Sequence, residues 1–232
     1  MKRRIPALIL SSILAGVCIA LGGTIFLRVR DLFPGASIVG ALFFTIGLFT
    51  VCTRKYALFT GKACYLFDGK AHPNQSVASY GLDLILIWIG NFIGTALVAF
   101  LEQNTSLCVG EKGLDVVATA LVDTKMAAPL ISLFILGFFC NIFIFIAVNG
   151  FMTNPHEVGK YLALFLGVAV FILCGTEHSV ADMYYWLVSG TFYSDPLASC
   201  LRLLVISAGN ILGGILIPVL ETVREKWESP VL

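Results

Sequence analysis

Two acids, an imidazole and a hydroxyl group follow one another closely in a stretch that is otherwise apolar enough to lie in a lipid bilayer. Residues 175–183 read Gly-Thr-Glu-His-Ser-Val-Ala-Asp-Met, and their polar groups are those of Glu177, His178, Ser179 and Asp182. An ionisable side chain at membrane depth costs roughly 2.5–3.5 kcal/mol on insertion scales, so such residues persist where they line a pathway or satisfy one another. We therefore expect the function of the chain to reside in this segment.

Two kinds of chemistry fit these residue types. Imidazole has an unperturbed pKa of about 6.5, so it can exchange a proton or donate a hydrogen bond to a species that passes through the membrane. Alternatively, Glu177, His178 and Asp182 could act as metal ligands or acid–base groups of an intramembrane enzyme. A metal site normally needs several imidazoles or thiolates, and His72 and His156 fall in expected loops. The sequence favours transport and predicts neither a metal nor another cofactor.

The composition predicts a membrane protein. Hydrophobic residues make up 58% of the 232 residues and charged residues 12%, and the mean hydropathy is +0.93, values well outside the norm for soluble domains. The net charge of +1 gives no reason to expect a nucleic-acid partner. The seven cysteines include no C-x-x-C pair, so we assign them no redox or metal role. We predict a single transmembrane domain over residues 1–232, all-α and polytopic, with the lipid bilayer as its surroundings.

Four apolar stretches are long enough to cross a bilayer, at about 20 residues each. They are Ile5–Leu27, Leu84–Leu101, Leu130–Val148 and Leu203–Leu220. The first is longer than the apolar region of a signal peptide and lacks a cleavage site, so we interpret it as a transmembrane helix.

Two further stretches are interrupted by charge and are predicted to be broken helices. One runs from Ile38 to Thr53, meets Arg54 and Lys55, and resumes at Tyr56. The other runs from Tyr161 to Thr176, meets Glu177-His178, and resumes at Met183. Neither apolar piece is long enough to cross alone. The chain is thus predicted to have six transmembrane helices, with the second and fifth broken.

The order of full, broken and full spans occurs twice, which predicts an inverted (3+3) repeat. Three spans per half is an odd number, so the halves, about 1–110 and 120–232, must have opposite orientations. Gly90-Asn91-Phe92-Ile93-Gly94 in the third span resembles Gly209-Asn210-Ile211-Leu212-Gly213 in the sixth. Paired discontinuous helices in inverted repeats indicate a substrate site near the midplane of the bilayer.

Basic residues in the expected loops predict that both termini are cytoplasmic, in the inner (cytoplasmic) membrane of the cell. Eight lie on the side of the N-terminus and five on the other side. The eight are Lys2, Arg3, Arg4, Lys62, Lys70, Lys160, Arg224 and Lys226, and the five are Arg28, Arg30, Lys112, Lys125 and Arg202.

Four short motifs, in order along the chain, resemble the formate/nitrite transporter family. They are Leu58-Phe59-Thr60, Gly137-Phe138-Phe139-Cys140-Asn141, Glu177-His178-Ser179-Val180-Ala181 and Gly209-Asn210-Ile211-Leu212-Gly213-Gly214. The resemblance covers nearly the whole membrane domain. It implies a homopentamer of protomers with an aquaporin-like fold, each with its own pore for a small monovalent anion such as formate, nitrite, hydrosulfide or lactate.

The resemblance also implies roles for individual residues. Phe44 and Phe171 would form the outer constriction, Leu48 and Leu58 the inner one, and His178 and Thr60 would face the anion between them. Lys125, sixteen residues before Asn141, is similar in placement to a family lysine that would attract anions. A network around it would contain Glu177, Asn141 and Asp182. Asn210 joins the pathway through its motif, although Asn91 and Asn210 could instead be interhelical hydrogen-bonding residues.

Three positions depart from the family pattern. Thr176 stands where phenylalanine is usual, Asp182 replaces a usual asparagine, and Ala57 stands where an acid is common. Asp182 places a second acid near Glu177, so one of the two could be protonated, paired with Lys125 or hydrogen-bonded in the loop.

Overall fold

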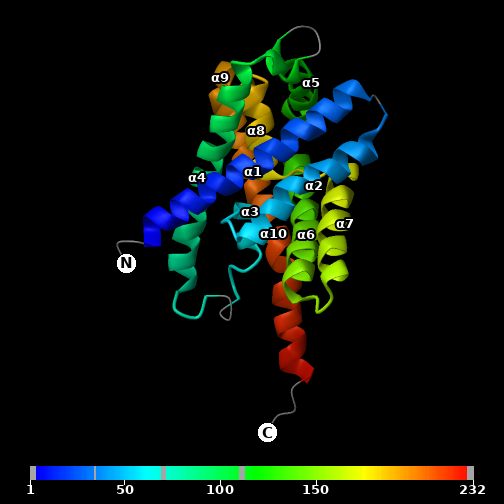
Figure 1. Ribbon diagram of the computed structural model, residues 1–232. Coiled ribbons are helices and arrows are strands. Elements are labelled where there is room, and N and C mark those ends of the chain that lie inside the picture. Colours follow the sequence, from blue (N-terminus) through cyan, green and yellow to red (C-terminus); the bar gives the residue numbers. More distant parts are fainter. Residues whose placement is uncertain (1–3, 34, 69–71, 110–112, 229–232) are drawn as a thin grey trace.

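The computed structural model describes residues 4–33, 35–68, 72–109 and 113–228, and all regular structure in these ranges is helical (Figure 1). The helices are α1 (Arg4–Leu32), α2 (Ser37–Arg54), α3 (Phe59–Ala63), α4 (Val77–Gln103), η1 (Ser106–Cys108), α5 (Leu114–Ala127), α6 (Leu130–Thr153), α7 (Glu157–Leu173), α8 (Ser179–Val188), α9 (Thr191–Ser194) and α10 (Pro196–Glu228). By length and composition, α1, α2, α4, α6 and α10 could each cross a membrane. The expectation that the apolar piece before Arg54 is too short to cross alone is therefore wrong, because α2 begins before Ile38 and reaches 18 residues. Many large apolar side chains on these helices are exposed, as lipid contact requires. The prediction of an all-helical, multi-pass membrane protein is confirmed.

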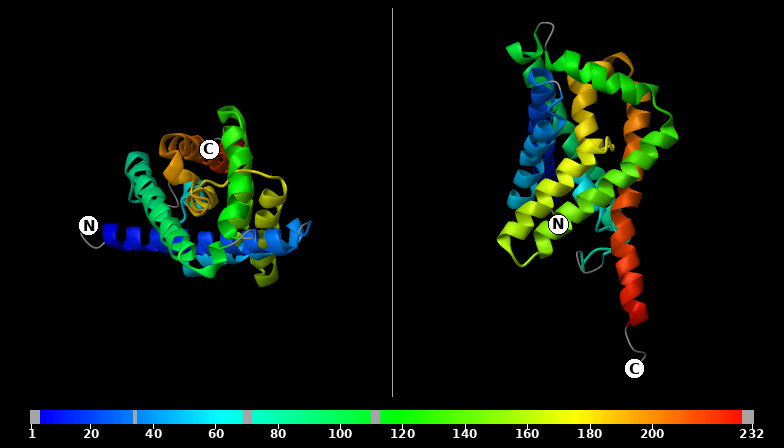
Figure 2. Two further views of the ribbon diagram at one scale, coloured as in Figure 1. Left: turned by 90° about the horizontal axis from the view of Figure 1, so that it is seen from above. Right: turned by 90° about the vertical axis from the view of Figure 1, so that its right-hand side faces the viewer.

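The helices form two similar groups that interlock. In the first group α1 packs against α2 and α4, and in the second α6 packs against α7 and α10. The groups meet where α2 packs on α7, and each also contacts a short helix of the other, since α8 packs on α4 and α3 on α10. All ten residues of α8 are buried. The two chemistry-bearing segments, at the starts of α3 and α8, therefore lie inside the molecule (Figures 1 and 2).

Glycines let the long helices of each group approach closely. A Cβ atom at Gly94 of α4 would collide with the carbonyl oxygen of Ile13 in α1, and one at Gly213 of α10 would collide with that of Phe138 in α6. Small residues at such crossings allow backbone-to-backbone contact in membrane proteins. The repeated Gly-Asn-x-x-Gly sequence therefore marks two equivalent helix crossings.

The interruptions of the apolar stretches lie near the predicted positions but differ in extent. Lys55 ends α2 in the left-handed conformation, with φ 57°, and α3 begins only at Phe59, so the expectation that the helix resumes at Tyr56 is wrong. In the second half α7 ends at Leu173 and α8 begins at Ser179, four residues before the expected Met183. The reason is that His178 caps α8, and capping residues direct where a helix starts.

Between the groups lies α5, a helix in a part of the chain that falls outside all six predicted spans. In α5 the buried residues Leu114, Ala118 and Val122 recur every four positions, which is the spacing of one helix face. The helix lies across the end of the molecule opposite the last turn of α10 (Figures 1 and 2). It carries Lys125 to the interior.

In Figure 1, α1 begins on the left at about mid-height and rises to the right, whereas α10 ends at the bottom. Of the basic residues used to predict the orientation, Lys2, Arg3, Lys70 and Lys112 lie outside the described residues.

Candidate functional site

Asn91 of α4 holds the interruption between α2 and α3. Its Oδ1 accepts a hydrogen bond from the Phe59 backbone N–H at 2.8 Å. Its Nδ2 donates to the carbonyl oxygens of Ser12 at 2.7 Å and Ala57 at 3.0 Å. A helix start in an apolar interior needs partners for its free backbone groups, and one buried amide bonds two of them, at Ala57 and Phe59, while its third bond ties the interruption to α1.

Asn210 of α10 does the same for the interruption between α7 and α8. Its Oδ1 accepts from the Ser179 backbone N–H at 3.0 Å, and its Nδ2 donates to the carbonyl oxygens of Gly137 at 2.8 Å and Glu177 at 2.9 Å. Both amide hydrogens thus bind backbone, which is the interhelical role that the sequence left open. Matching the two sets of bonds makes residues 57–59 equivalent to 177–179.

This equivalence pairs Leu58 with His178. The imidazole Nδ1 accepts a hydrogen bond from the Ala181 backbone N–H at 3.1 Å, so Nδ1 carries no proton in this arrangement. The proton of the neutral ring therefore lies on Nε2, which donates to Thr60 Oγ1 at 2.9 Å. Thr60 is fully buried and His178 is 3% exposed. The two residues expected to face the anion are thus hydrogen-bonded to each other.

Two phenylalanine rings extend the ring contacts that begin at the His178 imidazole. The Phe171 ring of α7 stacks on His178, with centroids 5.6 Å apart and planes inclined by 23°. Phe44 of α2 meets Phe171 edge-on, with centroids 6.0 Å apart and an angle of 88°. The rings come from the two helices that join the halves, and both are buried.

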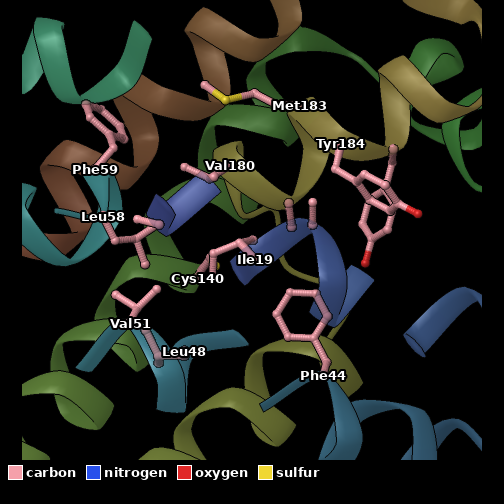
Figure 3. Close-up of a cluster of buried hydrophobic side chains, with 14 of the residues drawn as sticks. Ile19, Phe44, Leu48, Val51, Leu58, Phe59, Cys140, Val180, Met183 and Tyr184 are labelled. Carbon is pink, nitrogen blue, oxygen red and sulfur yellow. The ribbon is translucent and has the colours of Figure 1, made fainter. Parts of the chain in front are cut away.

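Leu48 and Leu58 lie at a cavity of about 980 Å³. Figure 3 shows them beside Val51 in the buried cluster, with Phe44 apart from them. Phe44 and Leu48 are four residues apart on α2, or about 6 Å along its axis. The cavity also borders the first turns of α1 and α7, and its basic lining residues are Arg4, Lys55, Lys62 and Lys160.

Lys125 bonds two carboxylates. Its Nζ forms ion pairs with Glu177 and with Asp182 Oδ1, the latter at 2.8 Å. The three side chains are buried, being 11%, 6% and 1% exposed. Asp182 Oδ2 has no hydrogen-bond partner in the part of the chain that the structure describes.

Asn141 was expected in the same network, but its hydrogen bonds go elsewhere. Its Nδ2 donates to the carbonyl oxygens of Asn210 at 2.7 Å and Thr60 at 3.1 Å. It therefore links α3 to α10 through the backbone of Thr60 and of Asn210.

A second buried polar group was missed by the sequence analysis. Glu102, in the last turn of α4, accepts hydrogen bonds from Thr24 and from Tyr184, both at 2.6 Å. It lies one residue beyond the predicted span Leu84–Leu101, and its charge at the end of an apolar stretch was the available signal.

The residues proposed as alternative metal ligands do not form a metal centre in the structure. Among the described residues, no three His, Cys, Asp or Glu side chains gather closely enough to hold a metal ion. Glu177 and Asp182 instead bind the Lys125 ammonium.

An all-helical membrane protein with a buried polar pair beside apolar side chains has the architecture of a transport protein. The chain belongs to the formate/nitrite transporter family, whose model matches residues 1–222. Membership of this family decides between transport and an intramembrane enzyme, because its members are transporters. The protein is therefore not an enzyme.

Individual relatives agree with this assignment. The formate channel FocA of Haemophilus influenzae is 28% identical over 186 residues, which are 75% of this chain and 63% of FocA. The nitrite transporter NirC of Escherichia coli is 29% identical over 216 residues, which are 88% of this chain and 78% of NirC. A solved pentameric formate channel with formate bound has the same fold, with a TM-score of 0.82 at 23% identity, covering 98% of this chain and all of that one.

Proposed function

We propose that this protein is a channel for small monovalent anions, formate and nitrite first, with hydrosulfide and lactate as further weak-acid candidates. The observation that carries the proposal is the buried Thr60–His178 pair, which presents a hydroxyl group and an N–H group beside the Phe44–Phe171 and Leu48–Leu58 pairs. A bare anion pays a large desolvation penalty among apolar side chains, so polar groups between two such constrictions lower the barrier.

The proposed channel is a homopentamer, and the solved pentameric formate channel of the same fold supports this assembly. We place one pore in each protomer. Each protomer has six spans in the inner membrane, counting α2 with α3 and α7 with α8 as single broken spans. Both termini are cytoplasmic. The equivalent bonds of Asn91 and Asn210 support repeats of about 1–110 and 120–232.

His178 has two proposed actions, which differ in cost. In the neutral ring, Nε2–H can transfer its hydrogen bond from Thr60 to a passing anion without any change of protonation. Proton delivery first requires an imidazolium, in which Nδ1 no longer accepts from the Ala181 N–H. A helix-capping bond is worth about 1 kcal/mol, so the relay carries a cost that hydrogen-bond donation avoids.

Flux into proteoliposomes tests the function. Formate, nitrite, hydrosulfide, lactate and chloride are compared side by side over a range of pH. We expect formate and nitrite to pass faster than in protein-free liposomes. Equal rates with and without the protein for all five anions would contradict the proposal.

His178→Asn tests the imidazole, since asparagine retains hydrogen-bonding groups but does not titrate near neutral pH. We expect lower flux and an altered pH response with the assembly intact. His156→Asn is the control, because His156 is an exposed histidine before α7. A wild-type rate and pH response in His178→Asn would reassign the imidazole to structure alone.

A further inference from the structure

Asp182 gives the buried Lys125 cluster one more carboxyl group than its single ammonium can neutralise. Glu177 and Asp182 both bond Lys125 Nζ. With all three groups ionised, the cluster carries a net charge of −1 in an interior where its side chains are at most 11% exposed. Burying an uncompensated charge is costly, and two carboxylates at one site do not ionise together readily.

Among the described residues, no further cation forms an ion pair with Glu177 or Asp182. The other titratable side chains that interact electrostatically with Lys125, Glu177 or Asp182 are Cys140 of α6, Tyr185 of α8 and His178. Arg30 of α1 interacts with Tyr185, but its guanidinium forms no ion pair with Glu177 or Asp182 among the described residues. A buried oxygen of Asp182 is also left without a partner in that part of the chain.

We propose that the Lys125 cluster is a proton-binding site, separate from His178, in which one proton is shared by the carboxyl groups of Glu177 and Asp182. With the proton bound, one ammonium, one carboxylate and one neutral acid give no net charge. Without the proton, the cluster has a charge of −1, and Glu177 is the direct sequence neighbour of His178. Because the two acids interact directly with one cation, the proton belongs to the pair and not to either acid.

The binding of a proton by the Lys125 cluster does not depend on the proposed function. Its effect on transport does rest on that function. The proton is bound at low pH and released as the pH rises. Its release leaves a negative charge near the path of an anion, which repels that anion. The wild-type protein should therefore lose anion flux as the pH rises, beyond any change due to titration of the substrate.

Asp182→Asn and Glu177→Gln test the site in two independent ways, because each leaves Lys125 with one carboxylate and no need for a proton. Infrared spectroscopy of the purified protein at neutral pH should show the carbonyl band of a protonated carboxylic acid. The band should shift when aspartate and glutamate are labelled with ¹³C. We expect the band to be lost in both variants, with one proton fewer bound per protomer in a potentiometric titration.

Glu102→Gln is the control, since Glu102 is another buried carboxyl group, bonded by hydroxyl groups of Thr24 and Tyr184. The band of the cluster should survive in this variant. A band lost only in Glu102→Gln would assign the proton to Glu102 and overturn the proposal. Absence of any acid band in the wild type would overturn it as well.

Transport is read as the ratio of Asp182→Asn flux to wild-type flux at each pH, which cancels titration of the substrate. The ratio should rise as the pH rises, because only the wild type gains a negative charge. A ratio independent of pH would overturn the link between the proton and transport. Absence of flux in the wild type would contradict the proposed channel and leave the spectroscopic result standing.

Discussion

One hydroxyl group determines where the His178 N–H points. Because Ala181 occupies Nδ1, the imidazole has a single hydrogen to donate, and Thr60 receives it. In the proposed channel, this donor and this hydroxyl group stay bonded to each other until an anion separates them. This arrangement ties the start of α8 to that of α3, so the same bond contributes to stability and to the proposed pathway.

Thr60→Val removes the hydroxyl group and keeps the shape. We expect slower anion flux, because the hydroxyl can no longer replace lost water around the anion. Stability should fall by about 1–3 kcal/mol, the usual cost of leaving a buried donor unpaired. Thr60→Ser should restore both. Thr95→Val is the matched control, since Thr95 is a buried threonine that bonds only the Phe92 carbonyl of its own helix.

Phe44→Ala combined with Phe171→Ala should widen selectivity toward larger anions. The two rings are in edge contact, and truncating both opens the space between α2 and α7. The measurement is the flux of lactate relative to formate, which we expect to rise. Phe43→Ala is the control, because the Phe43 ring, next to Phe44 in the sequence, is 57% exposed. An unchanged lactate-to-formate ratio would mean that the rings serve packing only.

At this scale the sequence predicted some contacts and left out others. The Leu58-Phe59-Thr60 and Glu177–Ala181 motifs predict that Thr60 and His178 both face the anion, and the structure adds the hydrogen bond between them. The Glu102, Thr24 and Tyr184 group was not, because its bonds join residues 78 to 160 positions apart that belong to no motif. The periodicity of one helix says nothing about such partners.

The elements are fixed relative to one another by the two asparagines. Asn210→Ala should destabilise the protein by about 1–3 kcal/mol for each backbone group left without a partner, and the residue holds three. Asn91→Ala should behave alike, because its three bonds are equivalent. The measurement is unfolding in detergent.

Asn104→Ala is the control for these substitutions. Asn104 is exposed and bonds the Phe100 carbonyl one turn before it, so its removal should change stability by no more than about 0.5 kcal/mol. Equal effects at positions 104 and 210 would show that the interruptions do not depend on the buried amides.

Gly213→Ala should force α6 and α10 apart. The new Cβ atom would collide with the Phe138 carbonyl oxygen, and overpacking of this kind costs typically about 1–3 kcal/mol. Gly81→Ala is the control, since nothing lies within 4 Å of a Cβ atom there. We expect that variant to gain about 0.4–1 kcal/mol through the unfolded chain. Thermal unfolding of both proteins gives the comparison, and a stabilised Gly213→Ala would contradict the crossing geometry.

The long helices were predictable because their apolar length is a strong signal, as for Leu130–Val148 within α6. The small helix α5 was missed because its charged and polar residues made it resemble a linker. Its Leu114, Ala118 and Val122 spacing was visible, but nothing in the sequence showed what that face would cover. The exact start of α8 depends on a cap and a distant asparagine, so it required the structure.

For the whole molecule we expect a pentamer. The exposed apolar side chains of the long helices, such as Leu82 at 65% and Ile131 at 65%, face lipid or a neighbouring protomer. Native mass spectrometry from detergent should give five copies of the 25.1 kDa chain. A stable monomer or dimer over the concentration range used for transport would contradict the assembly and would leave the pore within each protomer as a separate question.

The equivalence of Leu58 with His178 has a consequence for directionality. The two halves use the same amide scaffold, yet one presents a hydrocarbon branch and the other an imidazole at the matched position. The barriers met from opposite ends are therefore unequal, and the protein should rectify, carrying current more easily one way at equal and opposite driving force. Such asymmetry cannot accumulate anions against a gradient. It determines only how quickly either compartment responds when the gradient reverses.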